Sequence, residues 1–252
     1  MRLLLSLIFL LGTLTACIEE AESNSEPVAP VKETKTEAEI APTALSITEK
    51  ICQNQAFPGS KKLDSSAHRF GKACNLLELS GVRMENQVAL YLCKSELLSP
   101  GFPNNEGLAP ALVKETLGGH AEKADLLTNY GFAGKWFSLL IIKDSSDGSE
   151  SIIATKADLK NVPLTLTSDE AALAWAYLSG SLGQGMGNQG FSAKALCGAV
   201  LEKYSDGWML RNTDVFVNCA PRENRDIRIS NHGQVDVVKK TSDPNAPVLC
   251  VD

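Results

Sequence analysis

Basic side chains are too few and too scattered in this chain to form a nucleic-acid-binding surface. The sequence has 24 Lys and Arg residues against 30 Asp and Glu residues, which gives a formal net charge of −6. Without a basic stripe, we expect no nucleic-acid partner and no direct binding to anionic lipid surfaces. The three histidines (His68, His120 and His232) are scattered, and no C-x-x-C occurs. The sequence therefore predicts no metal and no cofactor.

The hydrophobic run near the start of the chain, Leu3–Leu11, is shorter than the roughly 20 residues that a permanent membrane helix needs. Arg2 precedes it, and small residues follow it before Cys17, as in a signal peptide. The segment Leu14–Cys17 resembles the lipobox of bacterial lipoproteins. This resemblance implies cleavage before Cys17, a diacylglyceryl group on its thiol and an acyl chain on its new amine. The lipid bilayer is then a partner of the protein.

The residue after the lipidated cysteine influences sorting in bacterial lipoproteins, where aspartate favours the inner membrane. Here that residue is Ile18. The resemblance therefore implies an outer-membrane protein that faces the periplasm, in preference to the inner membrane or the cell surface.

The sequence divides the chain into three segments. Residues 1–16 form the predicted signal peptide. Residues 17–43 begin with the lipidated cysteine and are rich in Glu, Ala, Pro, Ser and Thr without any aromatic residue, which predicts a disordered acidic tether. Such a coil would span about 25–30 Å. Residues 44–252 are long enough for a single domain with a substantial core.

An odd cysteine count in an exported protein needs an explanation. Of the seven cysteines, lipidation of Cys17 leaves an even set of six, which predicts three disulfides in an oxidising compartment. Three of the six lie early and three late, so at least one bond must join the two groups if all are paired. The connectivity stays open. The candidates are Cys52, Cys74, Cys93, Cys197, Cys219 and Cys250.

Residue patterns predict an α+β fold in which helices fill the N-terminal half and an antiparallel sheet lies mostly in the C-terminal half, with disulfides joining the parts. Helices are predicted over residues 46–52, 85–98, 110–117, 121–130 and 171–178. Strands are predicted over residues 136–143, 151–155, 199–204, 208–218, 226–230 and 234–239.

Glycines at 183, 185, 187 and 190 include a formal G-x-G-x-x-G, but the motif follows a helix instead of a strand. We interpret Gly183, Gly185, Gly187 and Gly190 as a candidate functional loop, either a lid or a partner contact. Asp144, Asp147 and Glu150 lack the spacing of a calcium loop and fit a hairpin turn better.

No catalytic residues are assigned, because no nucleophile elbow, S-x-x-K of the folded part or H-E-x-x-H is present. The first hypothesis is a non-enzymatic binding or accessory module of the cell envelope, with an envelope protein as partner. The alternative is a periplasmic hydrolase of cell-wall or secreted substrates, with a site near residues 180–190 and His120 as a base. A capture protein for a small ligand or metal is a third hypothesis. The sequence does not indicate the oligomeric state.

Overall fold

The computed structural model describes residues 45–64, 66, 68–85, 87–98, 110–131, 134–183, 191–248 and 250. Its contacts divide the chain into Met1–Thr43 and Ala44–Asp252, and all described residues belong to the second unit. The predicted signal peptide, Cys17 and the tether lie outside the described residues. In the part of the chain that is described, no helix has the length and apolar character needed to cross a membrane.

The larger of two main sheets has six strands and is antiparallel throughout. Its order is β1-β2-β4-β6-β5. β7 also pairs with β6, along a different part of that strand from β5. The strands are β1 (Ser60–Lys62), β2 (Asn75–Leu79), β4 (Gln87–Leu98), β5 (Leu126–Gly131), β6 (Gly134–Asp144) and β7 (Glu150–Ile153).

The second main sheet is a four-stranded antiparallel meander of order β12-β11-β10-β9. Ile229 pairs with Val235, and Arg228 pairs with Asp236, so apolar and charged residues alternate across the last hairpin. Ile229 is fully buried in consequence. The strands are β9 (Val200–Tyr204), β10 (Gly207–Val215), β11 (Glu223–Ser230) and β12 (Val235–Ser242).

Short helices and one small ribbon connect the sheets. The ribbon pairs β3 (Val82–Arg83) with β8 (Thr165–Leu166) in antiparallel fashion. The α-helices are α1 (Ile47–Asn54), α2 (Pro110–Leu117), α3 (His120–Lys123), α4 (Lys156–Leu159) and α5 (Asp169–Leu178), and a 3-10 helix, η2, covers Ala193–Leu196.

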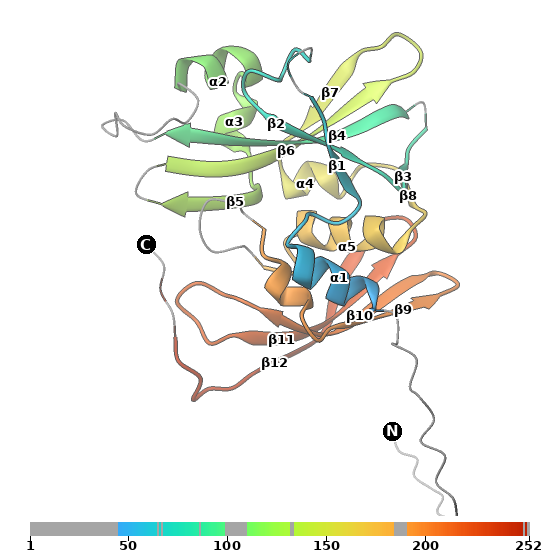
Figure 1. Ribbon diagram of the computed structural model, residues 1–252, viewed down its shortest axis with the longest axis vertical. Coiled ribbons are helices and arrows are strands. Elements are labelled where there is room, and N and C mark those ends of the chain that lie inside the picture. Colours follow the sequence, from blue (N-terminus) through green and yellow to red (C-terminus); the bar gives the residue numbers. More distant parts are fainter. Residues whose placement is uncertain are drawn as a thin grey trace, which may run out of the picture. The chain divides into compact units, whose positions relative to one another are not determined.

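The first core lies between the two main sheets, with α5 and α1 sandwiched between them (Figure 1). Every residue of Ala171–Leu178 is buried, because α5 meets side chains from both sheets. Leu92 and Leu140 join this core from the six-stranded sheet, and Trp208 and Ile227 join it from the four-stranded sheet. Both main sheets therefore pack on the same helix, α5.

A second core covers the opposite face of the six-stranded sheet. Cys93, Phe137 and Ile141 point to this side, where Val113 and Leu117 of α2 pack on them. Figure 1 shows α2 and α3 at the same end of the sheet. The six-stranded sheet is therefore covered on both faces.

The predicted fold class is wrong, because strands run through the whole described chain and helices are interspersed among them. The largest error is the helix predicted over residues 85–98, which is strand β4. Leu90 and Leu92 face the first core while Cys93 faces the second, so both sides of the strand are apolar. A strand buried on both faces is an apolar run that periodicity cannot distinguish from a buried helix. The helix predicted over residues 121–130 is also wrong, since α3 ends at Lys123 and β5 follows.

Three disulfides are present, as the cysteine count predicts. Cys74 bonds Cys93 within the early group, and Cys219 bonds Cys250 within the late group. Cys52 bonds Cys197 across 145 residues, which confirms that one bond joins the two groups.

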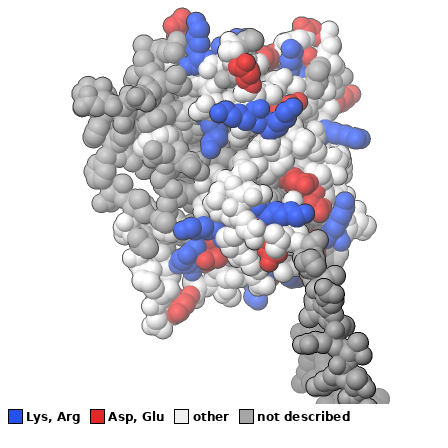
Figure 2. Space-filling view, in the orientation of Figure 1, with Lys and Arg blue, Asp and Glu red and all other residues white. Residues whose placement is uncertain are grey.

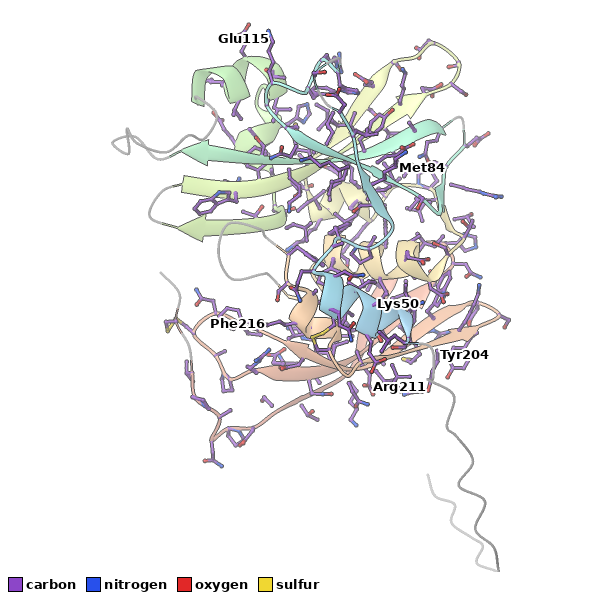
Figure 3. All side chains as sticks on the ribbon, in the orientation of Figure 1. Lys50, Met84, Glu115, Tyr204, Arg211 and Phe216 are labelled. Carbon is purple, nitrogen blue, oxygen red and sulfur yellow. A yellow bond between two sulfur atoms is a disulfide. The ribbon has the colours of Figure 1, made fainter. Side chains whose placement is uncertain are left out.

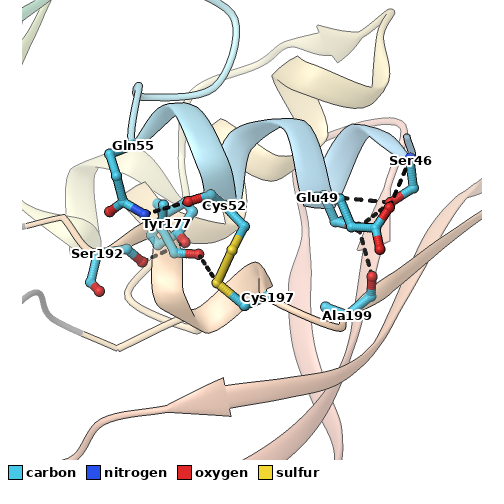
Figure 4. Close-up of a disulfide and its surroundings, with 10 residues drawn as sticks. Ser46, Glu49, Cys52, Gln55, Tyr177, Ser192, Cys197 and Ala199 are labelled. Atoms are coloured by element: carbon cyan, nitrogen blue, oxygen red, sulfur yellow. Dashed lines mark hydrogen bonds between the residues drawn. A yellow bond between two sulfur atoms is a disulfide. The ribbon is translucent and has the colours of Figure 1, made fainter. Parts of the chain in front are cut away.

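The Cys52–Cys197 bond links α1 to the end of η2 (Figure 4). Two hydrogen bonds reinforce this junction. The Thr48 hydroxyl donates to the Ala199 carbonyl at 2.6 Å, and the buried Tyr177 hydroxyl donates to the Ser192 carbonyl at 2.7 Å. Burial raises the pKa of Tyr177, so its hydroxyl stays a donor.

Candidate functional site

An open groove lies where the β3–β8 ribbon and α4 approach the β6–β7 hairpin. It consists of two hollows, of about 570 and 490 Å³, that share the lining residues Met84, Glu85 and Pro163. We call it the Met84 groove. Its apolar lining in the larger hollow is Met84, Ile142, Ile152, Ile153, Val162 and Pro163.

One wall of the groove is held by the β3–β8 ribbon. Thr167 closes the ribbon by donating its backbone N–H to the Gly81 carbonyl at 2.7 Å. Gly81 has a φ of +75°, and a Cβ there would lie 2.4 Å from the Ser168 hydroxyl, so only glycine fits. Met84 directly follows β3, and Figure 3 shows it beside the start of β4.

The opposite wall is α4 and the residues after it. The Thr155 hydroxyl accepts from the Asp158 N–H at 3.0 Å and donates to the Asp158 carboxylate at 2.7 Å. This reciprocal cap fixes the Asp158 side chain at the start of α4. After α4 ends at Leu159, a turn brings Val162 to the groove, with its N–H donating to the Leu159 carbonyl at 3.3 Å, and Pro163 follows.

The charges around the groove are unevenly divided. Glu85 and Asp158 line the larger hollow, and among the described residues no Lys or Arg lines it. Arg83 and His232 line the smaller hollow. His232 therefore lies in the turn where the sequence places it, and it also borders the groove.

A further hollow of about 600 Å³ lies between α1, the β1–β2 hairpin and the start of α5. Lys50, Lys61, Glu78 and Glu170 line it, so opposite charges balance. Figure 2 shows the same interspersion of basic and acidic side chains over this face of the molecule. The hollow offers no preference for a partner of either charge, and we regard the Met84 groove as the better candidate.

Comparisons with known protein families, with curated proteins and with solved structures find no match. The site is therefore interpreted from this chain's own residues.

The predicted glycine loop is only partly placed. Gly183 is described and packs closely on β10, where a Cβ would lie 2.5 Å from Val215. Gly185, Gly187 and Gly190 lie outside the described residues. Among the described residues, His120 is exposed at the start of α3 and makes no hydrogen bond or ion pair. The described contacts do not join it to an acidic side chain.

The third histidine, His68, belongs to a small cluster that sequence reasoning missed. Its Nε2 lies 3.2 Å from the Glu150 carboxylate, and its Nδ1 accepts from the Phe70 N–H at 3.3 Å. Because both ring nitrogens of the neutral form are occupied, neither is left to take a proton from a substrate. Burial, followed by the charges of Glu78 and Glu150, raises the pKa of the neighbouring Tyr91.

The acidic residues of the β6–β7 turn bind their own backbone. Asp144 accepts from the Ser146 N–H at 2.7 Å, and Asp147 accepts from the Ser149 N–H at 2.8 Å, which lowers the pKa of Asp147. These contacts agree with a hairpin turn. Among the described residues, no group of three metal-ligating side chains comes together.

A charged network on β11 ties the four-stranded sheet to the end of α5. The Glu223 side chain, only 8% exposed, forms ion pairs with Arg225 at 2.6 Å and with Lys240 at 2.5 Å. Arg225 also donates to the Ser181 carbonyl at 2.7 Å. Burial by itself would raise the pKa of Glu223, but the hydrogen bonds and charges of Lys240 and Arg225 outweigh it and lower the pKa.

Sequence reasoning missed the Met84 groove altogether. Met84 and Glu85 stand where a helix is predicted to begin, and Ile142, Ile153 and Val162 come from separate elements. No short-range spacing links these residues. Only the packing of the β3–β8 ribbon beside β6 and β7 brings them together.

Proposed function

We propose that this protein is a lipid-anchored lipoprotein of the bacterial outer membrane that faces the periplasm and acts as a non-enzymatic binding module of the cell envelope. The lipobox resemblance of Leu14–Cys17 supports the anchor, since acyl chains on Cys17 hold a protein to a bilayer. The three disulfides support an oxidising compartment outside the cytoplasm.

The Met84 groove is the observation that carries the binding role. Met84, Ile142, Ile152, Ile153 and Val162 are each only half-buried, so the groove keeps apolar surface in contact with water. Covering such surface yields about 25 cal/mol per Å², which a partner gains on binding. A methionine in the lining adapts its shape to different partners. The disulfides and both cores hold the surrounding sheets, so the groove is formed before a partner arrives.

Photocrosslinking in intact producing cells tests this function. A benzophenone amino acid replaces Asn161, an exposed residue at the groove, and in a matched variant it replaces Glu115, an exposed residue of α2. Figure 3 shows Glu115 on α2, away from Met84. We expect a discrete adduct from position 161 that position 115 does not give. Identical adduct patterns at both positions, or none at either, would contradict a binding role for the groove.

A further inference from the structure

The unpaired edge of β7 adds backbone hydrogen-bonding groups to the apolar lining of the Met84 groove. β7 pairs with β6 on one side, and no described strand pairs with its other side. Asp144 and Ser149 close the hairpin with a hydrogen bond of 2.9 Å, and hydrogen-bonded pairs alternate from there. The N–H and C=O of Ile152 therefore point to the open edge, and Ile152 lines the groove.

An unpaired strand edge beside an apolar groove is the arrangement that extended peptides recognise. The peptide adds a strand through main-chain hydrogen bonds, and every second side chain enters the groove. Ile142 and Ile153 would contact the apolar side chains of such a peptide from one wall, and Val162 from the other.

The charges at the groove select among peptides. The larger hollow has carboxylates from Glu85 and Asp158, and none of the described residues in its lining is basic. Glu85 makes no hydrogen bond or ion pair with the described residues, and Asp158 is oriented by Thr155. Arg83 lines only the smaller hollow, so the two carboxylates of the larger hollow favour a positively charged occupant there over a negatively charged one.

We infer that the Met84 groove binds an extended peptide segment of a partner protein whose groove-facing side chains, at every second position, include both apolar residues and Lys or Arg. The segment adds antiparallel or parallel to the free edge of β7. Its apolar side chains cover Met84 and the isoleucines, and its cations lie near Glu85 and Asp158. This inference rests on the proposed binding function and names the class of partner.

Binding of defined peptides to the full chain, purified in detergent, tests the inference. The probe is fluorescein-labelled Lys-Thr-Val-Thr-Val-Thr-Lys with capped ends, in which both Lys and both Val lie on one face of an extended strand, and binding is measured by fluorescence anisotropy. Replacing both Lys residues of the probe by Glu should weaken binding by at least about fivefold, the effect expected of two exposed charge pairs. Equal binding of the Lys and Glu peptides would overturn the inference.

Two protein variants separate the groove from general charge effects. In E85Q/D158N the preference for the Lys peptide should disappear, while the amide of Asn at 158 still accepts from Thr155. The matched control, E115Q/D236N, removes two exposed carboxylates outside the groove and should keep the preference. Loss of the preference in the control, or its persistence in E85Q/D158N, would contradict the assignment.

Two N-methylated forms of the Lys peptide test strand addition. One form carries N-methyl groups on the odd residues and the other on the even residues. Because an added strand uses every second N–H, one form should lose binding and the other should keep it. Equal binding of both forms would exclude strand addition. If none of the peptides binds while the position-161 adduct persists in cells, the peptide class is wrong and the binding function still stands.

Discussion

Removal of the Cys52–Cys197 disulfide should destabilise the protein more than removal of the Cys219–Cys250 disulfide. The first bond closes a loop of 145 residues and the second a loop of 31. Loop-entropy estimates for these lengths are about 5 and about 3.7 kcal/mol, a difference of about 1.4 kcal/mol, and measured effects are usually smaller. The perturbations are the double variants C52A/C197A and C219A/C250A.

The two variants are well matched, because Cys197, Cys219 and Cys250 are exposed and Cys52 is half-buried, so little packing is lost in either. The Cys74–Cys93 bond is a poorer comparison, since both cysteines lie in the second core. The assay is guanidinium unfolding of each non-reduced protein, followed by circular dichroism. Equal losses of unfolding free energy, or a larger loss in C219A/C250A, would refute the argument that the long loop makes the difference.

Three further predictions concern the network, the junction and the anchor. Glu223 has a lowered pKa when folded, so its contribution to stability is present above about pH 4.5 and declines as the pH falls below it. In E223Q the fall in unfolding midpoint between about pH 5 and 3 should be smaller, and an unchanged pH profile would contradict this. Y177F removes the donor to the Ser192 carbonyl and should lower the free energy of unfolding in urea by about 1–2 kcal/mol. An unchanged free energy of unfolding would show that this hydrogen bond does not stabilise the fold. C17S should leave the protein uncleaved or soluble on fractionation of cells, and unchanged processing and membrane association would exclude lipidation.

The C-terminal half of the fold could be predicted from local patterns because its sheet has one face toward the solvent. In β11 and β12, buried Ile227 and Ile229 alternate with exposed Arg228, which predicts strands. In the structure Ile227 pairs with Val237, so these two apolar residues lie on the same face of the sheet. α2 was predicted as well, from Pro110 at its first position and Gly118 after its end.

Strand β4 could not be predicted in this way, because the six-stranded sheet is covered on both faces. Leu92 and Cys93 are both fully buried but belong to different cores, so neither face of β4 is polar. The same limit applies to the Met84 groove, whose walls meet only after β3 has paired with β8 across more than 80 residues of chain. The even number of cysteines that remains after Cys17 predicts the three disulfides correctly, because this inference does not depend on the periodicity of apolar residues.

Amide hydrogen exchange of the full chain tests the central claim most directly. Exchange is measured once on the protein purified in detergent and once in envelope preparations from producing cells. The binding account predicts slower exchange in the envelope at Glu150–Ile153 of β7 and at Asn161 and Val162, with little change in β12. Unchanged exchange at these residues, or slowing confined to β12, would show that the Met84 groove is not where the protein meets its partner.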